Sequence, residues 1–434
     1  MTKKRRYRAI SVNDAAKVAA LIEAVAAERV AIGIDIAKTR QFAAFTTPDG
    51  RVHGTIRWEH PKESPQFVEL LRDLVARSSE VEVVLEPSGT YGDALRAALL
   101  RADLPVYRVN PKRSHDAAEV YDGVPSLHDA KSAAIVAKLH FDGASEPWPV
   151  TSAHQRDLAA ALRVLEIYQK QFQQNRNRLE GVLARFWPEL PRVLDLGSVT
   201  LLTLVSEFGS PQEVSRRREE AQELMRRVGG HQLDREKVEL VLDEAERSFG
   251  MEPTAEETLA VQAIALEARR CQKAARAARK KVEALTDMSG PAREMRVVVG
   301  KTTAAVLVAA VGDPTKYGST SAYQKALGLN LKEKSSGKHQ GALHVTKRGP
   351  GVARLFLYLA ALRLVQRDPI VKAWYAKKVA RQGGIAKNRA VVAVMRKLAK
   401  ALWHVAGGAT FDSRKLFDVS RLRLAMEPPI EARA

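Results

Sequence analysis

Apolar residues between positions 30 and 110 occur in short runs that predict β-strands. The runs begin at Val30, Gln41, Arg51, Val81 and Leu104. Pro48-Asp-Gly50 separates the second run from the third and is a hairpin signal. Helical patterns occupy residues 64–78, 91–102 and 127–141. Strands joined early by hairpins and then alternating with helices predict a mixed α/β sheet.

The second half of the chain has the pattern of helices. Two long polar segments, 152–186 and 254–286, have imperfect heptads and could pair as an antiparallel coiled coil. The expected fold is thus α/β plus α. We divide the chain into a basic tail with a short helix (1–28), a sheet domain (29–150), long helices with an inserted helical region (151–290), a mostly helical domain containing a Ser- and Gly-rich loop (291–410) and a tail (411–434).

Charge points to a polyanionic partner. The 434 residues have a net charge of +20, and residues 330–400 contain 17 Lys or Arg against two acids. A solvated helical surface is the alternative, but such a concentration of cations more often faces phosphates. No apolar run has the ~20 residues of a membrane span, and no secretory signal precedes the first helix. Cys271 is the only cysteine, which excludes a disulfide framework and fits a reducing cytoplasm.

Three acidic residues occupy positions that are typical of a catalytic or metal-binding site. Asp35 interrupts an apolar strand, where an unpaired carboxylate is costly unless it binds a cation. Glu86 ends another strand before a Pro-Ser-Gly turn, and Asp129 begins a helix. If they converge at one edge of the sheet, their oxygens suit a hard divalent cation that acts on a phosphodiester. Otherwise Asp129 is a helix N-cap and Glu86 a surface acid.

In order and spacing, these motifs resemble a known family. Gly33-Ile-Asp-Ile-Ala-Lys, Leu85-Glu-Pro-Ser-Gly-Thr-Tyr-Gly, Val109-Asn-Pro and the Asp129 helix look like the N-terminal domain of DEDD transposases of the insertion sequence 110 family. Ala326-Leu-Gly-Leu, Ser335-Ser-Gly-Lys and Thr346-Lys-Arg-Gly-Pro resemble its second domain. The resemblance implies an RNase H-like fold of the RuvC type and a DNA recombinase.

The resemblance also implies a metal site. Asp35, Glu86 and Asp129 match the first three family acids and would bind Mg²⁺, with Mn²⁺ as a substitute. The fourth acid is replaced by Ser132, whose hydroxyl is a poorer ligand. Asp116 or Asp122 could supply the missing ligand. In the other register Asp129 is the fourth acid and Ser126 takes third place.

A serine nucleophile is the second implied element. Ser336 matches the family serine that holds DNA covalently, and Ser335 is the neighbouring alternative; a flexible linker is the other reading of this loop. Six cations would contact the DNA backbone: Lys332, Lys334, Lys338, Lys347, Arg348 and Arg354. The family further implies a noncoding bridge RNA that selects the target by base pairing.

We therefore expect a transposase that acts on double-stranded DNA, at element ends and targets, in a prokaryotic cytoplasm near the nucleoid. Strand exchange needs several active centres, so a homodimer or homotetramer is expected. Two alternatives remain. A RuvC-like junction-resolving nuclease would use only the acids, and an inactive RNA- or DNA-binding protein would explain the missing fourth acid.

Overall fold

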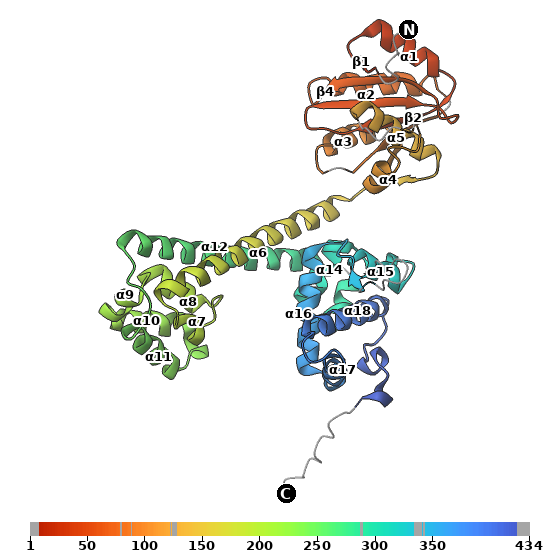
Figure 1. The fold of residues 1–434 in the computed structure, drawn as a ribbon. Coiled ribbons are helices and arrows are strands. Elements are labelled where there is room, and N and C mark those ends of the chain that lie inside the picture. The colour runs from red at the N-terminus through yellow and green to blue at the C-terminus, as the bar shows by residue number, and fades with distance from the viewer. Residues whose placement is uncertain are drawn as a thin grey trace. The chain divides into compact units, whose positions relative to one another are not determined.

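The computed structural model describes residues 8–78, 80–87, 89–121, 123, 128–286, 290–333, 341 and 343–422 (Figure 1). The chain divides into two compact units, residues 1–150 and 151–434. None of the helices in these ranges combines the length and the apolar character that crossing a bilayer requires.

Unit 1 is built on a seven-stranded mixed sheet of order β1-β4-β3-β2-β5-β6-β7. Its strands are β1 (Ile10–Ser11), β2 (Arg29–Asp35), β3 (Arg40–Thr46), β4 (Val52–Glu59), β5 (Glu80–Leu85), β6 (Val106–Val109) and β7 (Ser145–Pro147). Antiparallel pairing joins β2, β3 and β4, whereas β2, β5 and β6 run parallel. The expected mixed α/β sheet is confirmed, with the short edge strands β1 and β7 in addition.

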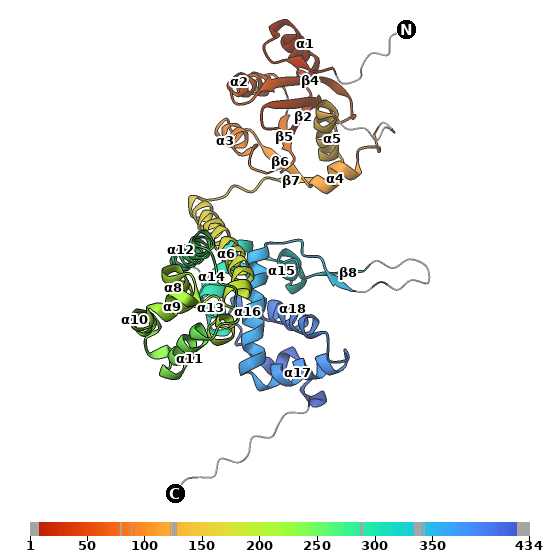
Figure 2. The same cartoon turned by 60° about the vertical axis from the view of Figure 1, so that its left-hand side comes forward.

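Side-chain alternation divides the sheet into two faces. Its helices are α1 (Ala15–Val25), α2 (Ser64–Val75), α3 (Asp93–Arg101), α4 (Pro111–Asp116) and α5 (Asp129–Phe141). Val30, Ile32 and Ile34 of β2 pack in one core with α1, α2 and α3. The intervening residues of β2 face α5, which covers the opposite side (Figure 2). The face under α5 therefore includes Ala31, Gly33 and Asp35.

Gly33 allows α5 to lie directly against β2. A Cβ atom built on Gly33 would be 2.1 Å from the Ala133 carbonyl oxygen and 2.5 Å from the Ala137 backbone nitrogen. Both are backbone atoms of α5, so no side-chain rotation can make room. The absence of a side chain at position 33 thus sets the distance between the helix and the strand.

The substitution Gly33→Ala is expected to push α5 off the sheet. We expect a loss of about 1–3 kcal/mol of stability, as for other overpacked cores, and faster amide exchange along α5. Hydrogen–deuterium exchange of the full chain measures this locally. Gly181→Ala is the control, because its Cβ would meet nothing within 4 Å; unchanged exchange in α5 of Gly33→Ala would contradict the packing argument.

A buried polar cluster holds the other end of α5. Glu82 of β5 is 3% exposed and accepts two bonds from Arg29, at 3.0 and 2.8 Å. His140 of α5 lies 3.1 Å from the same carboxylate. Burial acts to raise the pKa of Glu82, but the hydrogen bonds from His140 and Arg29 outweigh it and hold that pKa below its ordinary value. The cluster therefore ties α5 to β2 and β5.

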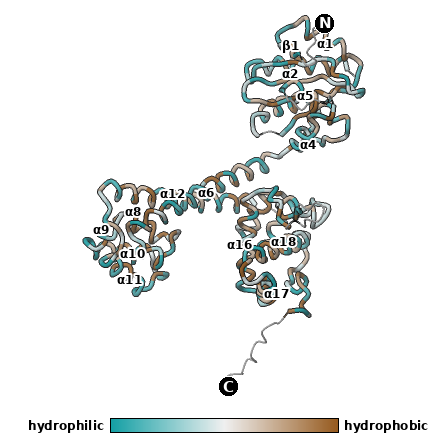
Figure 3. The backbone as a smooth tube through the Cα atoms, viewed as in Figure 1, coloured by the Kyte–Doolittle hydropathy of each residue, from teal (hydrophilic) through white to brown (hydrophobic). Residues whose placement is uncertain are grey.

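Unit 2 contains two long helices packed side by side, α6 (Ala153–Phe186) and α12 (Ala255–Thr286). Ser152 begins α6 with a capping box completed by Gln155. Leu158, Leu162 and Leu165 are buried at helical spacing. Hydrophilic and hydrophobic residues both occur along the pair (Figure 3). Burial of the apolar stripe explains why two such polar helices are stable.

Shorter helices complete unit 2. Between the long helices lie α7 (Leu190–Val193), α8 (Val199–Phe208), α9 (Pro211–Arg216), α10 (Arg218–Gly229) and α11 (Arg235–Glu246). After them come α13 (Gly290–Val299), α14 (Lys301–Val311), α15 (Thr320–Ala326), α16 (Gly351–Arg367), α17 (Pro369–Ala380) and α18 (Lys387–Ala406). A hairpin of β8 (Leu331–Lys332) and β9 (His344–Val345) joins α15 to α16. Single 3₁₀ turns occur at 230–232, 314–316, 413–416 and 419–421.

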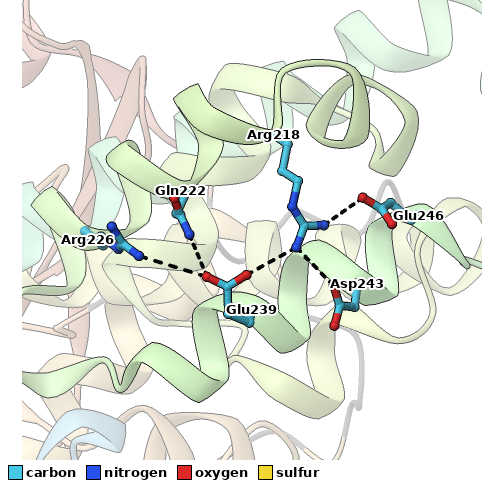
Figure 4. A network of polar contacts seen from close by, with 6 residues as sticks. All are labelled: Arg218, Gln222, Arg226, Glu239, Asp243 and Glu246. Atoms are coloured by element: carbon cyan, nitrogen blue, oxygen red, sulfur yellow. Dashed lines mark hydrogen bonds and ion pairs between the residues drawn. The ribbon is translucent and has the colours of Figure 1, made fainter.

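An ion-pair network joins α10 to α11 (Figure 4). Arg218 contacts Glu239 at 3.2 Å, Asp243 at 3.0 Å and Glu246 at 2.7 Å. Gln222 also donates to Glu239, at 2.6 Å. One guanidinium therefore bridges three carboxylates on the neighbouring helix.

Arg218→Met is expected to loosen this helix pair. Three carboxylates would then repel one another, at a cost of about 1–2 kcal/mol, more than an isolated surface pair contributes. Amide exchange in α10 and α11 should accelerate about tenfold in low salt, and less in high salt because the charges are screened. Arg216→Met, which removes one exposed pair with Glu213, should change exchange little. Equal effects of both variants would rule out a network.

Candidate functional site

Two of the three predicted acids lie side by side at one edge of the sheet. Asp35 is the last residue of β2, and Glu86 directly follows β5. The strands are parallel and in register, with Ile34 opposite Leu85. Because side chains alternate, Asp35 and Glu86 both project on the face that α5 covers. Both are half-buried.

Asp129 reaches the same place from α5. It is the first residue of the helix, one turn before Ala133, which lies against Gly33. The N-cap is His128, whose ring Nδ1 accepts from the Lys131 backbone at 3.3 Å. The alternative role of Asp129 as the N-cap is thereby excluded, so its exposed carboxylate is not used for capping.

The charges of the three acids act on one another. Burial raises the pKa of Asp35 to about 6, and repulsion from Asp129 and then Glu86 adds to that shift. Within the part of the chain that the structure describes, none of the three carboxylates has a hydrogen-bond or ion-pair partner. This is an arrangement that a cation would stabilise.

The three carboxylates are not close enough together to hold a metal ion as they stand. No group of three or more His, Cys, Asp or Glu side chains in the described ranges is close enough to hold an ion without movement. Like-charged carboxylates without a counter-ion repel, which is the physical reason to expect them apart. Their common face and mutual charge effect fit a divalent cation, whose binding would require the carboxylates to come closer together.

The candidates for the fourth ligand differ in their surroundings. Ser132 lies three residues after Asp129, on the same side of α5, and is half-buried. Asp116 pairs instead with Lys112 of its own helix at 2.7 Å, and the hydrogen bond from Lys112 lowers its pKa. Asp122 and Ser126 lie outside the described residues. Ser132 is thus the candidate placed next to the acids.

Sequence reasoning missed two cations near these acids. Lys131 is in the first turn of α5 and is only 3% exposed. Arg57 of β4 is exposed on the face under α5. Arg57 could have been found from the alternation Ile56-Arg57-Trp58, whose apolar members both belong to the core on the other face. A buried lysine such as Lys131 has no signal of this kind.

The second predicted element, the serine loop, lies between α15 and α16, where the structure has the β8–β9 hairpin. Ser335, Ser336, Lys334 and Lys338 lie outside the described residues, so only the base of the hairpin is characterised. There, Leu331 pairs with Val345 and Lys332 with His344. Lys332, Lys347 and Arg348 are exposed at this base.

Two of the sequence motifs pack against each other at the hairpin base. The Lys347 amide donates to the Gly328 carbonyl at 3.0 Å. A Cβ atom on Gly349 would be 2.4 Å from the Ala326 carbonyl oxygen, so only glycine fits. Arg354 is half-buried and donates to the Gly349 carbonyl at 2.6 Å. The Gly-Leu and Lys-Arg-Gly motifs therefore form one structural unit that anchors the hairpin.

Part of the basic charge of this region has a structural use. Besides Arg354, several cations donate to backbone carbonyls and so tie loops to helices. They are Arg363 to Val299, Arg396 to Leu329, Lys397 to Leu416 and Lys377 to Arg421. The expected contact of Arg354 with DNA stays a prediction, but its present hydrogen bond makes it a positioning residue for the hairpin.

Two family models match segments of this chain. Residues 32–188 match the family DEDD_Tnp_IS110, described as "Transposase". Residues 297–376 match "Transposase IS116/IS110/IS902 family". A protein of Streptomyces coelicolor, "Insertion element IS110 uncharacterized 43.6 kDa protein", is 24% identical over 406 residues, which are 89% of this chain and 96% of that protein.

The matched segments together span more than half of the chain, and the first of them includes Asp35, Glu86 and Asp129. The sheet unit is accordingly an RNase H-like domain, and the family consists of enzymes that cut and rejoin DNA. The resemblance inferred from the motifs is confirmed. The chain belongs to the IS110 family of DEDD transposases.

Proposed function

We propose that this transposase cuts and rejoins DNA strands with a divalent-cation site at Asp35, Glu86 and Asp129 and a serine nucleophile at Ser336. One observation supports the metal site. Three carboxylates without a partner among the described residues share one face, and the pKa of Asp35 is raised to about 6 by burial and by the other two. Such a perturbed cluster of acids is typical of a functional site.

The acids would bind Mg²⁺ or Mn²⁺ through carboxylate oxygens, with the Ser132 hydroxyl beside them. The bound cation would supply charge stabilisation to the phosphodiester during its displacement. Asp35 would contribute the half-buried ligand. Glu86 and Asp129 are placed by the end of β5 and the start of α5.

The serine step conserves the number of phosphodiester bonds. The Ser336 oxygen bonds to phosphorus, the bond to one strand oxygen breaks, and that oxygen leaves as a hydroxyl with the serine proton. The reverse attack by a strand hydroxyl rejoins DNA and frees Ser336. Lys332, Lys347 and Arg348 at the hairpin base would stabilise the phosphate charge.

A noncoding RNA would choose the sites that are joined. Base pairing would read the sequence while the cations of unit 2 hold nucleic-acid backbones, a division of labour seen in guided nucleases. This part of the proposal rests on the family membership and on the basic charge of residues 330–400.

The test is a cleavage assay with the full-length protein, labelled element-end DNA and RNA transcribed from the flanking noncoding DNA. We expect strand cleavage and a covalent protein–DNA adduct only when Mg²⁺ or Mn²⁺ is added, with EDTA as control. Cleavage without an adduct would favour a junction-resolving nuclease. Binding without cleavage in any cation would favour an inactive binding protein.

A further inference from the structure

A cleft in unit 1 opens beside the acid site. It has a volume of about 690 Å³, within the range of ligand-binding pockets. Asp129 is the one acid of the three that lines it, together with His128 at the start of α5. Arg8, Lys17 and Arg57 line the same cleft. Three cations thus lie next to a carboxylate of the proposed metal site.

The sheet register explains how Arg57 reaches this cleft. Asp35 is opposite Phe42 of β3, and Phe42 is opposite Arg57 of β4. Residues opposite each other on neighbouring strands project on the same face. Two strand spacings of about 4.8 Å separate the backbones of Asp35 and Arg57. The Arg57 side chain therefore lies on the same face of the sheet as Asp35, and the two backbones are about 10 Å apart across the strands.

Two of the three cations have no partner in the part of the chain that the structure describes. Across the described ranges, the guanidinium groups of Arg8 and Arg57 form neither a hydrogen bond nor an ion pair. Lys17 is different, because it pairs with Asp14, which also lines the cleft. Two exposed guanidinium groups left unpaired in one cleft are suited to the paired oxygens of a phosphate.

We infer that Arg8 and Arg57 form a phosphate-binding subsite for the DNA strand that is cut, next to the phosphodiester at the acids. The inference rests on the proposed metal-dependent cleavage and extends it by naming where the adjoining backbone lies. Asp129 of the acid site also lines this cleft. The backbone bound there is therefore that of the cleaved strand rather than of a strand bound elsewhere on the protein. The subsite contacts phosphates only and so positions the strand without reading its sequence.

Thiol crosslinking tests the subsite without requiring cleavage. Cys271 is fully buried, so the Arg57→Cys variant of the full chain presents a single reactive thiol. A DNA oligonucleotide with a disulfide-activated tether on one phosphate should crosslink to it in the presence of Ca²⁺. Arg101→Cys is the matched control, because Arg101 is exposed on α3, which packs on the other face. Equal crosslinking of both variants would overturn the inference.

Binding measurements give a second readout. For the double variant Arg8→Ala/Arg57→Ala we expect DNA affinity to fall on the order of tenfold. The slope of log affinity against log salt should decrease by about 0.7 for each lost contact with a single strand. Arg101→Ala should change neither quantity. An unchanged slope in the double variant would overturn the subsite.

The two proposals can fail separately. Crosslinking at Arg57→Cys without metal-dependent cleavage by the wild type would support the subsite and refute the proposed chemistry. Normal cleavage and affinity in the double variant would support the chemistry and refute the subsite. Preferential crosslinking to an RNA oligonucleotide with the same tether would assign the cleft to RNA and overturn the inference.

Discussion

Asp35→Asn is expected to abolish metal-dependent strand cleavage and to make the metal-free protein more stable at neutral pH. The amide is a weaker ligand for a hard cation, so the site loses its buried anionic oxygen. In the absence of metal the same change removes a carboxylate that burial and two neighbouring acids disfavour. Activity and stability should therefore move in opposite directions.

The pH dependence follows from the raised pKa. The folded state keeps the Asp35 proton up to about pH 6, whereas the unfolded chain releases it near 3.8. Stability of the metal-free protein should thus fall as pH rises through that window and stay lower above it. The cost at pH 8 is about 1–2 kcal/mol after allowance for partial exposure. Below pH 6, protons should compete with Mg²⁺.

Thermal unfolding across pH, with and without MgCl₂, measures these effects. Wild type should gain stability with Mg²⁺ at pH 8, and Asp35→Asn should gain little. Asp73→Asn is the control, since Asp73 is an exposed acid on α2. The metal site would be refuted if Mg²⁺ stabilised Asp35→Asn as much as the wild type, or if that variant cleaved DNA normally.

Ser336→Ala is expected to eliminate the covalent protein–DNA adduct and to lower strand exchange by about 10⁴-fold or more, as loss of a nucleophile does elsewhere. Alanine lacks the hydroxyl oxygen that would bond to phosphorus. Metal-induced stabilisation should persist, because the acids of unit 1 are unchanged. Labelled DNA on a denaturing gel detects the adduct.

Ser335→Ala is the matched control for this variant and should retain the adduct. If the adduct persists in Ser336→Ala but disappears in Ser335→Ala, the nucleophile is the neighbouring serine. Undiminished cutting by both variants would leave a nuclease that uses only the acids. The adduct and the metal effect therefore report separately on the two elements.

The hydrophobic pattern predicted much of the sheet and singled out Asp35 as a candidate site residue. Strands β2 to β6 have apolar runs long enough to show their period. Asp35 could be singled out because a carboxylate in such a run needs a partner. By contrast, β1 and β7 have two and three residues, too few to show any period.

The surroundings of the acids were harder to foresee. Arg57 alternates with buried residues, but the alternation does not reveal that Arg57 shares a face of the sheet with Asp35. That arrangement depends on register between strands distant in sequence. His128 likewise occupies the N-cap position that was the alternative role of Asp129, because a histidine ring nitrogen can accept the same backbone hydrogen bond.

The contact at Gly33 has an evolutionary consequence. A clash between two side chains can be relieved by a smaller residue on the partner, so such positions covary. Here the obstacles to a Cβ at position 33 are the Ala133 carbonyl oxygen and the Ala137 nitrogen, which every residue possesses. No compensating mutation in the helix can therefore rescue a larger residue, and mutant libraries should recover glycine at this position regardless of what occupies 133 and 137.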